Sequence, residues 1–177
     1  MPSRFSKIVA VLAVGLAAGA AQAQPAKKPA PAAAKAAAFD ARDPASVVAY
    51  LTSLGATAKP SPGQDAGFYD ITTPGGNFGL QFVGCDKAGK TCEALAFSTA
   101  FERKGATMAH INGFNRSQVS CRGFMGDDGR PNVMYATLVT ARMPADEMRL
   151  HVGAWQGCLA LFSEFTRDPP GFLARQP

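Results

Sequence analysis

Two cysteines at the near ends of two strand-like segments constrain this chain more than any other feature. One segment runs from Gly76 to Cys85, the other runs from Cys92 to Ser98, and the polar loop 86–91 joins them. Residues that face each other in an antiparallel pair lie about 4.5–5.5 Å apart at Cα, within the range that a disulfide accepts. We therefore predict a Cys85–Cys92 disulfide, which requires a compartment where thiols are oxidised.

The first 23 residues predict such a compartment independently. Arg4 and Lys7 form a positive region, an apolar stretch covers residues 8–20, and the small-x-small pattern Ala21-Gln-Ala23 follows. This order is typical of a secretory signal peptide cleaved after Ala23, and its apolar core is too short to span a bilayer. We expect a periplasmic or secreted protein with no integral membrane segment after cleavage. The alternative is an uncleaved membrane anchor.

Residues 24–38 consist almost entirely of Ala, Pro and Lys. So little apolar bulk, together with helix-interrupting prolines, predicts a disordered tether. Its three lysines either bind an anionic surface or act as a solubilising spacer. Together with the two basic residues of the signal peptide they account for the whole net charge of +5. Residues 39–177 are therefore neutral, and this neutrality argues against nucleic-acid binding.

Residues 39–168 have the length of one domain and alternate between helix and strand patterns. Asp43-Pro44 followed by apolar residues at helical spacing predicts a helix that ends at Gly55. A second helix is predicted over about residues 104–115, and a long helix opens at Pro144. The predicted strands cover residues 56–59, 68–72, 77–83, 92–101, 119–125 and 132–141, with a turn at Asp127–Gly129.

This order predicts an α+β fold, in which helices pack on one face of an antiparallel sheet of about five strands. The chain would run helix, three or four strands, helix, two strands, helix, and residues 169–177 would form a C-terminal tail. No internal repeat is visible in the sequence.

Several of these segments have a characteristic order and spacing: Leu54-Gly55, residues 76–85 with Cys92, residues 95–98, Ile111–Arg116, the Asp127–Gly129 turn and the last predicted helix with Trp155. Together they resemble the YbjN family of bacterial sensory transduction regulators. The resemblance covers about residues 39–166, and it implies the fold of type III secretion chaperones, which bind unfolded or partly folded protein segments and usually dimerise. The predicted export departs from the cytoplasmic role that the family description suggests.

The other two cysteines leave two possibilities open. Cys121 on a predicted strand and Cys158 on the sheet-facing side of the last helix form either a second disulfide or two buried thiols. The chain contains no Cys-x-x-Cys, so the sequence favours neither a zinc site nor redox catalysis.

No catalytic or cofactor-binding pattern stands out. His110 and His151 lie on different predicted helices, and neither belongs to a His-Glu-x-x-His pattern. The sequence has no nucleophile elbow and no phosphate-binding glycine loop. Asp127–Gly129 has too few carboxylates for a calcium loop and is interpreted as a turn. We expect no enzyme activity, no cofactor and no metal; an unrecognised hydrolase is the enzymatic alternative.

Asn112, Asn115 and Trp155 are the candidate binding residues. Helix interiors disfavour asparagine because its side chain competes for backbone hydrogen bonds. We expect Asn115 to end the second helix or to cap the next turn, and Asn112 to bond to an adjacent strand; the alternative is that both bind a ligand or partner. Trp155 belongs either to the core or to an interface.

These features favour a protein-binding or chaperone-like regulatory module of the bacterial envelope. Its partner would be another protein or a second copy in a dimer, and it would need an exposed apolar groove or a dimer interface. The alternative function is a small-ligand sensor with a pocket between the sheet and the last helix.

Overall fold

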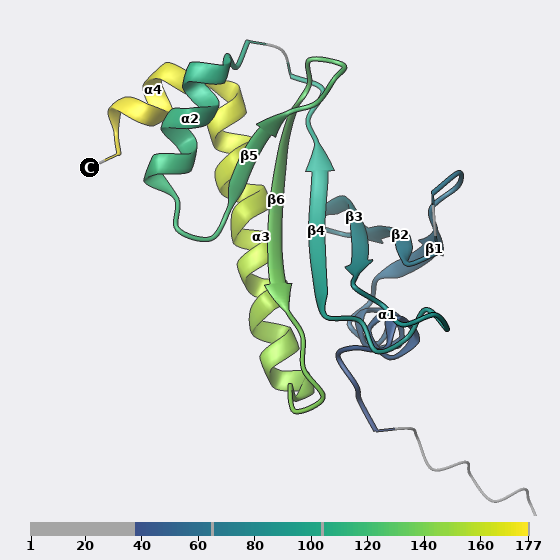
Figure 1. The fold of residues 1–177 in the computed structure, drawn as a ribbon. Helices are drawn as coiled ribbons and strands as arrows, with labels where there is room; N and C mark the ends of the chain where they lie inside the picture. The colour runs from purple at the N-terminus through teal and green to yellow at the C-terminus, as the bar shows by residue number, and fades with distance from the viewer. Residues whose placement is uncertain (1–37, 65, 104, 177) are drawn as a thin grey trace, which may run out of the picture. The chain divides into compact units, whose positions relative to one another are not determined.

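Ten helices and strands make up the part of the chain that the structure describes, a computed structural model covering residues 38–64, 66–103 and 105–176 (Figure 1). The predicted signal peptide and nearly all of the predicted tether lie outside these residues. The elements are α1 (Pro44–Ser53), β1 (Thr57–Pro60), β2 (Phe68–Thr73), β3 (Gly76–Val83), β4 (Ala94–Ala100), α2 (Met108–Ser117), β5 (Arg122–Met125), β6 (Pro131–Leu138), α3 (Ala145–Arg167) and α4 (Pro169–Ala174).

The first helix shows how local chemistry sets the boundaries of an element. The Asp43 carboxylate accepts a hydrogen bond from the backbone N–H of Ala45 at 3.1 Å, and Pro44 occupies the first helical position. After the helix, Gly55 adopts a φ of +91°, in the left-handed region that glycine enters without a steric penalty. The predicted helix and both of its end signals are confirmed.

All six strands pair antiparallel in one sheet, in the order β1-β2-β3-β4-β6-β5. Neighbours in the sheet are neighbours in the sequence, except that β6 lies between β4 and β5. The predicted α+β class and antiparallel sheet are confirmed, with the short strand β1 as the sixth strand.

Helices pack on one face of this sheet. Alternate residues of β3 are buried, namely Phe78, Leu80 and Phe82, and Leu80 lies opposite Phe97 of β4. Trp155 of α3 lies over the same face, with ring centroids 5.6 Å from Phe78 and 5.9 Å from Phe97. Figure 1 shows α3 running alongside β6, on which it packs.

The first six residues of the segment predicted as a C-terminal tail form the helix α4. Two consecutive prolines suggested the end of a helix, but proline fits the first helical turn, where its missing N–H leaves no hydrogen bond unmade. Asp168 caps this helix by accepting from the Gly171 N–H at 3.0 Å. Phe172 is buried against Phe114 and Phe165, so α4 belongs to the core.

Two disulfides connect elements of the fold. Cys85 and Cys92 are joined by an S–S bond of 2.04 Å across the loop between β3 and β4. Cys121, just before β5, is joined to Cys158 in α3 by a bond of 1.95 Å. The second bond therefore links an edge strand to the long helix that covers the sheet. Of the helices in the described part of the chain, none combines the length and apolar character needed to cross a membrane.

Removing each disulfide separately tests how the two bonds stabilise the fold. The Cys121→Ala/Cys158→Ala variant should lose about 4 kcal/mol in free energy of unfolding and Cys85→Ala/Cys92→Ala about 2.5 kcal/mol, because the entropy gained by the unfolded chain grows with the loop released. The bonded cysteines are 37 and 7 positions apart, respectively. Urea unfolding measures both losses, with reduced wild type as the comparison. Equal midpoints for oxidised and reduced wild type would contradict this account.

Candidate functional site

A cleft of about 640 Å³ opens between the β2–β3 hairpin, the end of β4 and α3. It lies between the sheet and α3, the long helix that the sequence predicted to open at Pro144. The small-ligand-sensor hypothesis requires a pocket at this place. The hairpin contributes residues 73 and 75–78, β4 and the residue after it contribute 99–101, and α3 contributes four side chains on one flank. Those four are Gln156, Leu159, Ala160 and Ser163.

A smaller pocket of about 250 Å³ adjoins this cleft. The two cavities have Thr73, Gly75, Phe78 and Gln156 in common. The smaller pocket extends toward the end of α1 and includes Trp155. The smaller pocket lies between α1, which packs on β1, and α3, which packs on β6.

The cleft contains polar side chains, and none of the side chains that line it is charged. Its polar side chains are the hydroxyls of Thr73, Thr99 and Ser163 and the amides of Asn77 and Gln156, and no Asp, Glu, His, Lys or Arg lines it. The Thr73 hydroxyl donates to the Gly76 carbonyl at 2.9 Å, and the Thr99 hydroxyl donates to the Asn77 carbonyl at 3.1 Å. Both hydroxyl oxygens keep lone pairs that can accept a further hydrogen bond.

Trp155 lies in the core, and its side chain is completely buried. Its indole N–H has no hydrogen-bond partner among the described residues, although a buried Trp N–H usually finds one. Phe162 and Phe165, on the same helix, are also fully buried. Sequence reasoning left the choice between core and interface open, because an apolar stripe on a helix has the same pattern in both cases.

Neither asparagine of α2 has the role in the fold that the sequence predicted. Asn115 bonds to the strand: its side-chain amide donates to the Gly123 carbonyl at 3.0 Å, and its Oδ1 accepts from the Gly123 N–H at 2.7 Å. The helix continues beyond it to Ser117, so Asn115 does not end it. Asn112 is exposed. Neither asparagine lines the cleft, so the structure does not bring them together with Trp155 in one site.

The histidines also lie apart. His110 caps α2, because its Nδ1 accepts from the Thr107 N–H and its own N–H donates to the Thr107 hydroxyl, both at 3.2 Å. His151 Nδ1 lies 2.6 Å from the Tyr135 hydroxyl, and burial raises the pKa of Tyr135. Within the described ranges, no three His, Cys, Asp or Glu side chains are grouped so that they could hold a metal ion.

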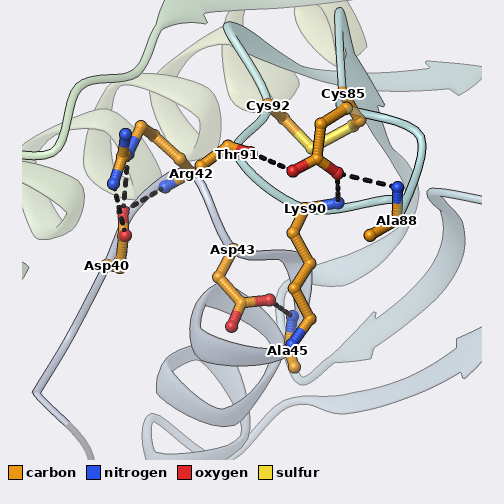
Figure 2. The surroundings of a disulfide bond; sticks show 10 residues. Asp40, Arg42, Asp43, Ala45, Cys85, Ala88, Lys90, Thr91 and Cys92 are labelled. Atoms are coloured by element: carbon orange, nitrogen blue, oxygen red, sulfur yellow. Dashed lines mark hydrogen bonds and ion pairs between the residues drawn. A yellow bond between two sulfur atoms is a disulfide. The ribbon is translucent and has the colours of Figure 1, made fainter.

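The loop closed by Cys85–Cys92 is organised around one carboxylate (Figure 2). Asp86 accepts hydrogen bonds from the backbone N–H groups of Ala88 and Lys90, at 3.0 and 2.8 Å, and from the Thr91 hydroxyl. The Thr91 bond first, and then the Lys90 bond, hold the pKa of Asp86 below its ordinary value. The arrangement is that of a structural loop stabilised by a disulfide and a charged hydrogen-bond acceptor.

The face of the sheet away from the helices carries a second candidate site, which sequence reasoning missed. Three rows of residues cross β3, β4 and β6 there, and we call them the outer sheet face. The row that contains Val83 and Leu138 is the most exposed, with 45% and 74% of these side chains accessible. The rows are Gly79–Ser98–Met134, Gln81–Ala96–Ala136 and Val83–Ala94–Leu138.

None of these outer positions carries a charge, and most are small or apolar. The signal was present in the sequence as uncharged residues at alternate positions of three strands. Recognising it required the register of β6 against β4, because β5 and α2 separate these strands along the chain.

Comparison with protein families identifies the class to which this α+β domain belongs. Residues 43–165 match the model of the YbjN family, whose description reads "Putative bacterial sensory transduction regulator". The match begins at the cap of α1, includes all six strands and ends within α3. The chain belongs to the YbjN family, as its sequence predicted. No curated protein matches the sequence.

Replacing each asparagine of α2 separately tests the assignment of Asn115 to the fold. Asn115→Ala should lower the free energy of unfolding by about 1–3 kcal/mol, because it leaves the N–H and carbonyl of the buried Gly123 unpaired. The exposed Asn112→Ala is the matched control and should change stability by less than about 0.5 kcal/mol. Chemical denaturation measures both. Equal losses for the two variants would contradict the assignment.

The Asp86 carboxylate predicts an acid-sensitive contribution to stability. Its folded-state pKa is lowered, so this contribution is fully present above the unfolded-state pKa of about 3.9 and is lost as pH falls through the folded value. The difference in free energy of unfolding between wild type and Asp86→Asn should be constant above about pH 5 and shrink below about pH 4. Urea unfolding across this range measures it. A difference that does not vary with pH would argue against the assignment.

Proposed function

We propose that this protein is an exported, non-catalytic regulator that binds another protein through its outer sheet face. The single observation that carries the proposal is the lack of charge on β3, β4 and β6 of this face, between Asp70 of β2 on one side and Arg122 of β5 on the other. The exposed face of an antiparallel sheet ordinarily carries polar residues. A contiguous exposed patch that is apolar and uncharged is typical of a protein interaction site.

The row Val83–Ala94–Leu138 is the centre of the proposed interface. Its two large side chains are exposed and lie on either side of the small Ala94, so the row presents a shallow apolar surface. Burying such side chains against a partner stabilises a complex by removing apolar area from water. A second copy of the chain is the alternative partner, because an uncharged face can meet itself without like-charge repulsion.

Two features support the exported location. The N-terminal pattern of basic, apolar and small residues is that of a secretory signal. All four cysteines are paired in disulfides, and disulfides persist in oxidising compartments. A non-catalytic role is supported by the lining of the cleft, which contains no titratable acid, base or thiol.

A matched pair of leucine variants tests the proposed interface. Leu138 on the outer sheet face and Leu150 on α3 are almost equally exposed, at 74% and 73%. Leu138→Glu should reduce capture of the partner by about tenfold or more, since it would bury an unpaired charge in the complex. Leu150→Glu should capture it like the wild type. The measurement is crosslinking in the native envelope, followed by purification of the tagged protein.

Sedimentation of the purified variants identifies the partner class. If the partner is a second copy, wild type and Leu150→Glu will associate as concentration rises, whereas Leu138→Glu will remain monomeric. If the partner is another protein, all three will sediment as monomers and only the crosslinked yield will differ. Equal capture and equal sedimentation of the two variants would rule out the outer sheet face as the interface.

A further inference from the structure

We infer that the cleft between the β2–β3 hairpin and α3 binds a small uncharged molecule that carries a carbonyl or hydroxyl oxygen beside a flat apolar ring. The cleft lies at the ends of β3 and β4 farthest from the Val83–Ala94–Leu138 row. The inference is therefore independent of the proposed protein-binding face, and either can fail without the other.

The size of the cavity is the first argument. The larger cleft measures about 640 Å³ and the adjoining pocket about 250 Å³. Ligand sites for small molecules commonly measure about 300–1,000 Å³. Because the cavities have four lining residues in common, one molecule can occupy the cleft and extend toward the end of α1.

The lining selects the charge of the ligand. Hydroxyl and amide groups supply all the polar side chains of the larger cleft. An ionic ligand would lose hydration on entry, and no side chain that lines the cleft carries the opposite charge. The Arg103 guanidinium lies beside this wall but already donates to the Ser163 carbonyl at 3.1 Å. An uncharged ligand loses less hydration, and it can both donate to and accept from amides such as those of Asn77 and Gln156.

The apolar part of the lining selects a flat group. Phe78 and Phe101 contribute ring surface from the sheet side, and Leu159 contributes an aliphatic surface from α3. Aromatic rings pack favourably against a second ring in stacked or edge-to-face geometry. A ligand with one planar apolar face therefore fits this wall better than a flexible polar chain.

The single tryptophan of the chain belongs to the wall of the smaller pocket. Trp155 is fully buried and has no partner for its Nε1 among the described residues. An acceptor oxygen of a ligand could reach this donor only if the wall moved. The amides of Asn77 and Gln156 are therefore the donors that favour a ligand with an acceptor oxygen.

Three probes of nearly identical shape test the inference. Benzamide is neutral, benzoate is negative and benzamidine is positive at neutral pH, and each has a planar ring. The chain contains one tryptophan, so a ¹⁵N-labelled sample gives a single tryptophan indole signal, which reports directly on Trp155. Benzamide should shift this signal saturably with a Kd of about 1–10 mM, the affinity expected for a fragment of about nine non-hydrogen atoms. Benzoate and benzamidine should bind about tenfold more weakly or worse.

Variants on one helix locate the binding. Ala160 lines the cleft, whereas Ala154 is exposed on the same helix and lines neither cavity. Ala160→Phe should weaken the benzamide shift by occupying part of the cleft, and Ala154→Phe should leave it unchanged. Gln156→Glu adds a negative charge at nearly constant shape, so it should weaken benzamide binding and make benzamidine the preferred probe.

The inference would be overturned by the absence of a saturable benzamide shift, by equal binding of the three probes, or by unchanged benzamide binding in Ala160→Phe. Unaltered probe preference in Gln156→Glu would also overturn it, because the charge of the lining would then have no part in selection. Leu138→Glu should bind benzamide like the wild type, which keeps this test separate from that of the protein interface.

Discussion

The packing of Trp155 against Phe78 and Phe97 is the contact on which the rest of this structure depends. It places the long helix α3 on one face of the sheet, with the single tryptophan of the chain completely buried. Removing this much aromatic surface from water is among the largest contributions one side chain makes to folding. The Cys121–Cys158 bond then restrains the same helix covalently against the start of β5.

Both candidate sites follow from that placement. Since the helices pack on one face, the outer sheet face is left without a covering layer, and its uncharged rows remain available to a partner. The cleft opens where α3 passes the turn of the β2–β3 hairpin and the end of β4. The same arrangement that forms the core therefore creates an apolar surface on one side and a neutral polar cavity on the other.

Much of the fold was predictable because its signals are local. The Asp43-Pro44 cap, the alternation of Phe78, Leu80 and Phe82 and the apolar stripe of α3 each act within a few residues. The helix α4 was missed because consecutive prolines end a helix as readily as they begin one, and only the burial of Phe172 against Phe114 decides between these readings. The sequence did not reveal that Asn115, rather than Asn112, bonds to the strand, because the position of β5 beside α2 is a tertiary fact.

The sequence by itself determined the family, the α+β class and most element boundaries, since capping, periodicity and turn chemistry are short-range properties. It also determined that residues 39–177 carry no net charge. Only the tertiary structure decided that Trp155 belongs to the core, that the three uncharged rows lie side by side on one face, and that hydroxyl and amide groups from β2–β4 and α3 surround one cleft. Each of these depends on contacts between residues far apart in the chain, which local propensity does not specify.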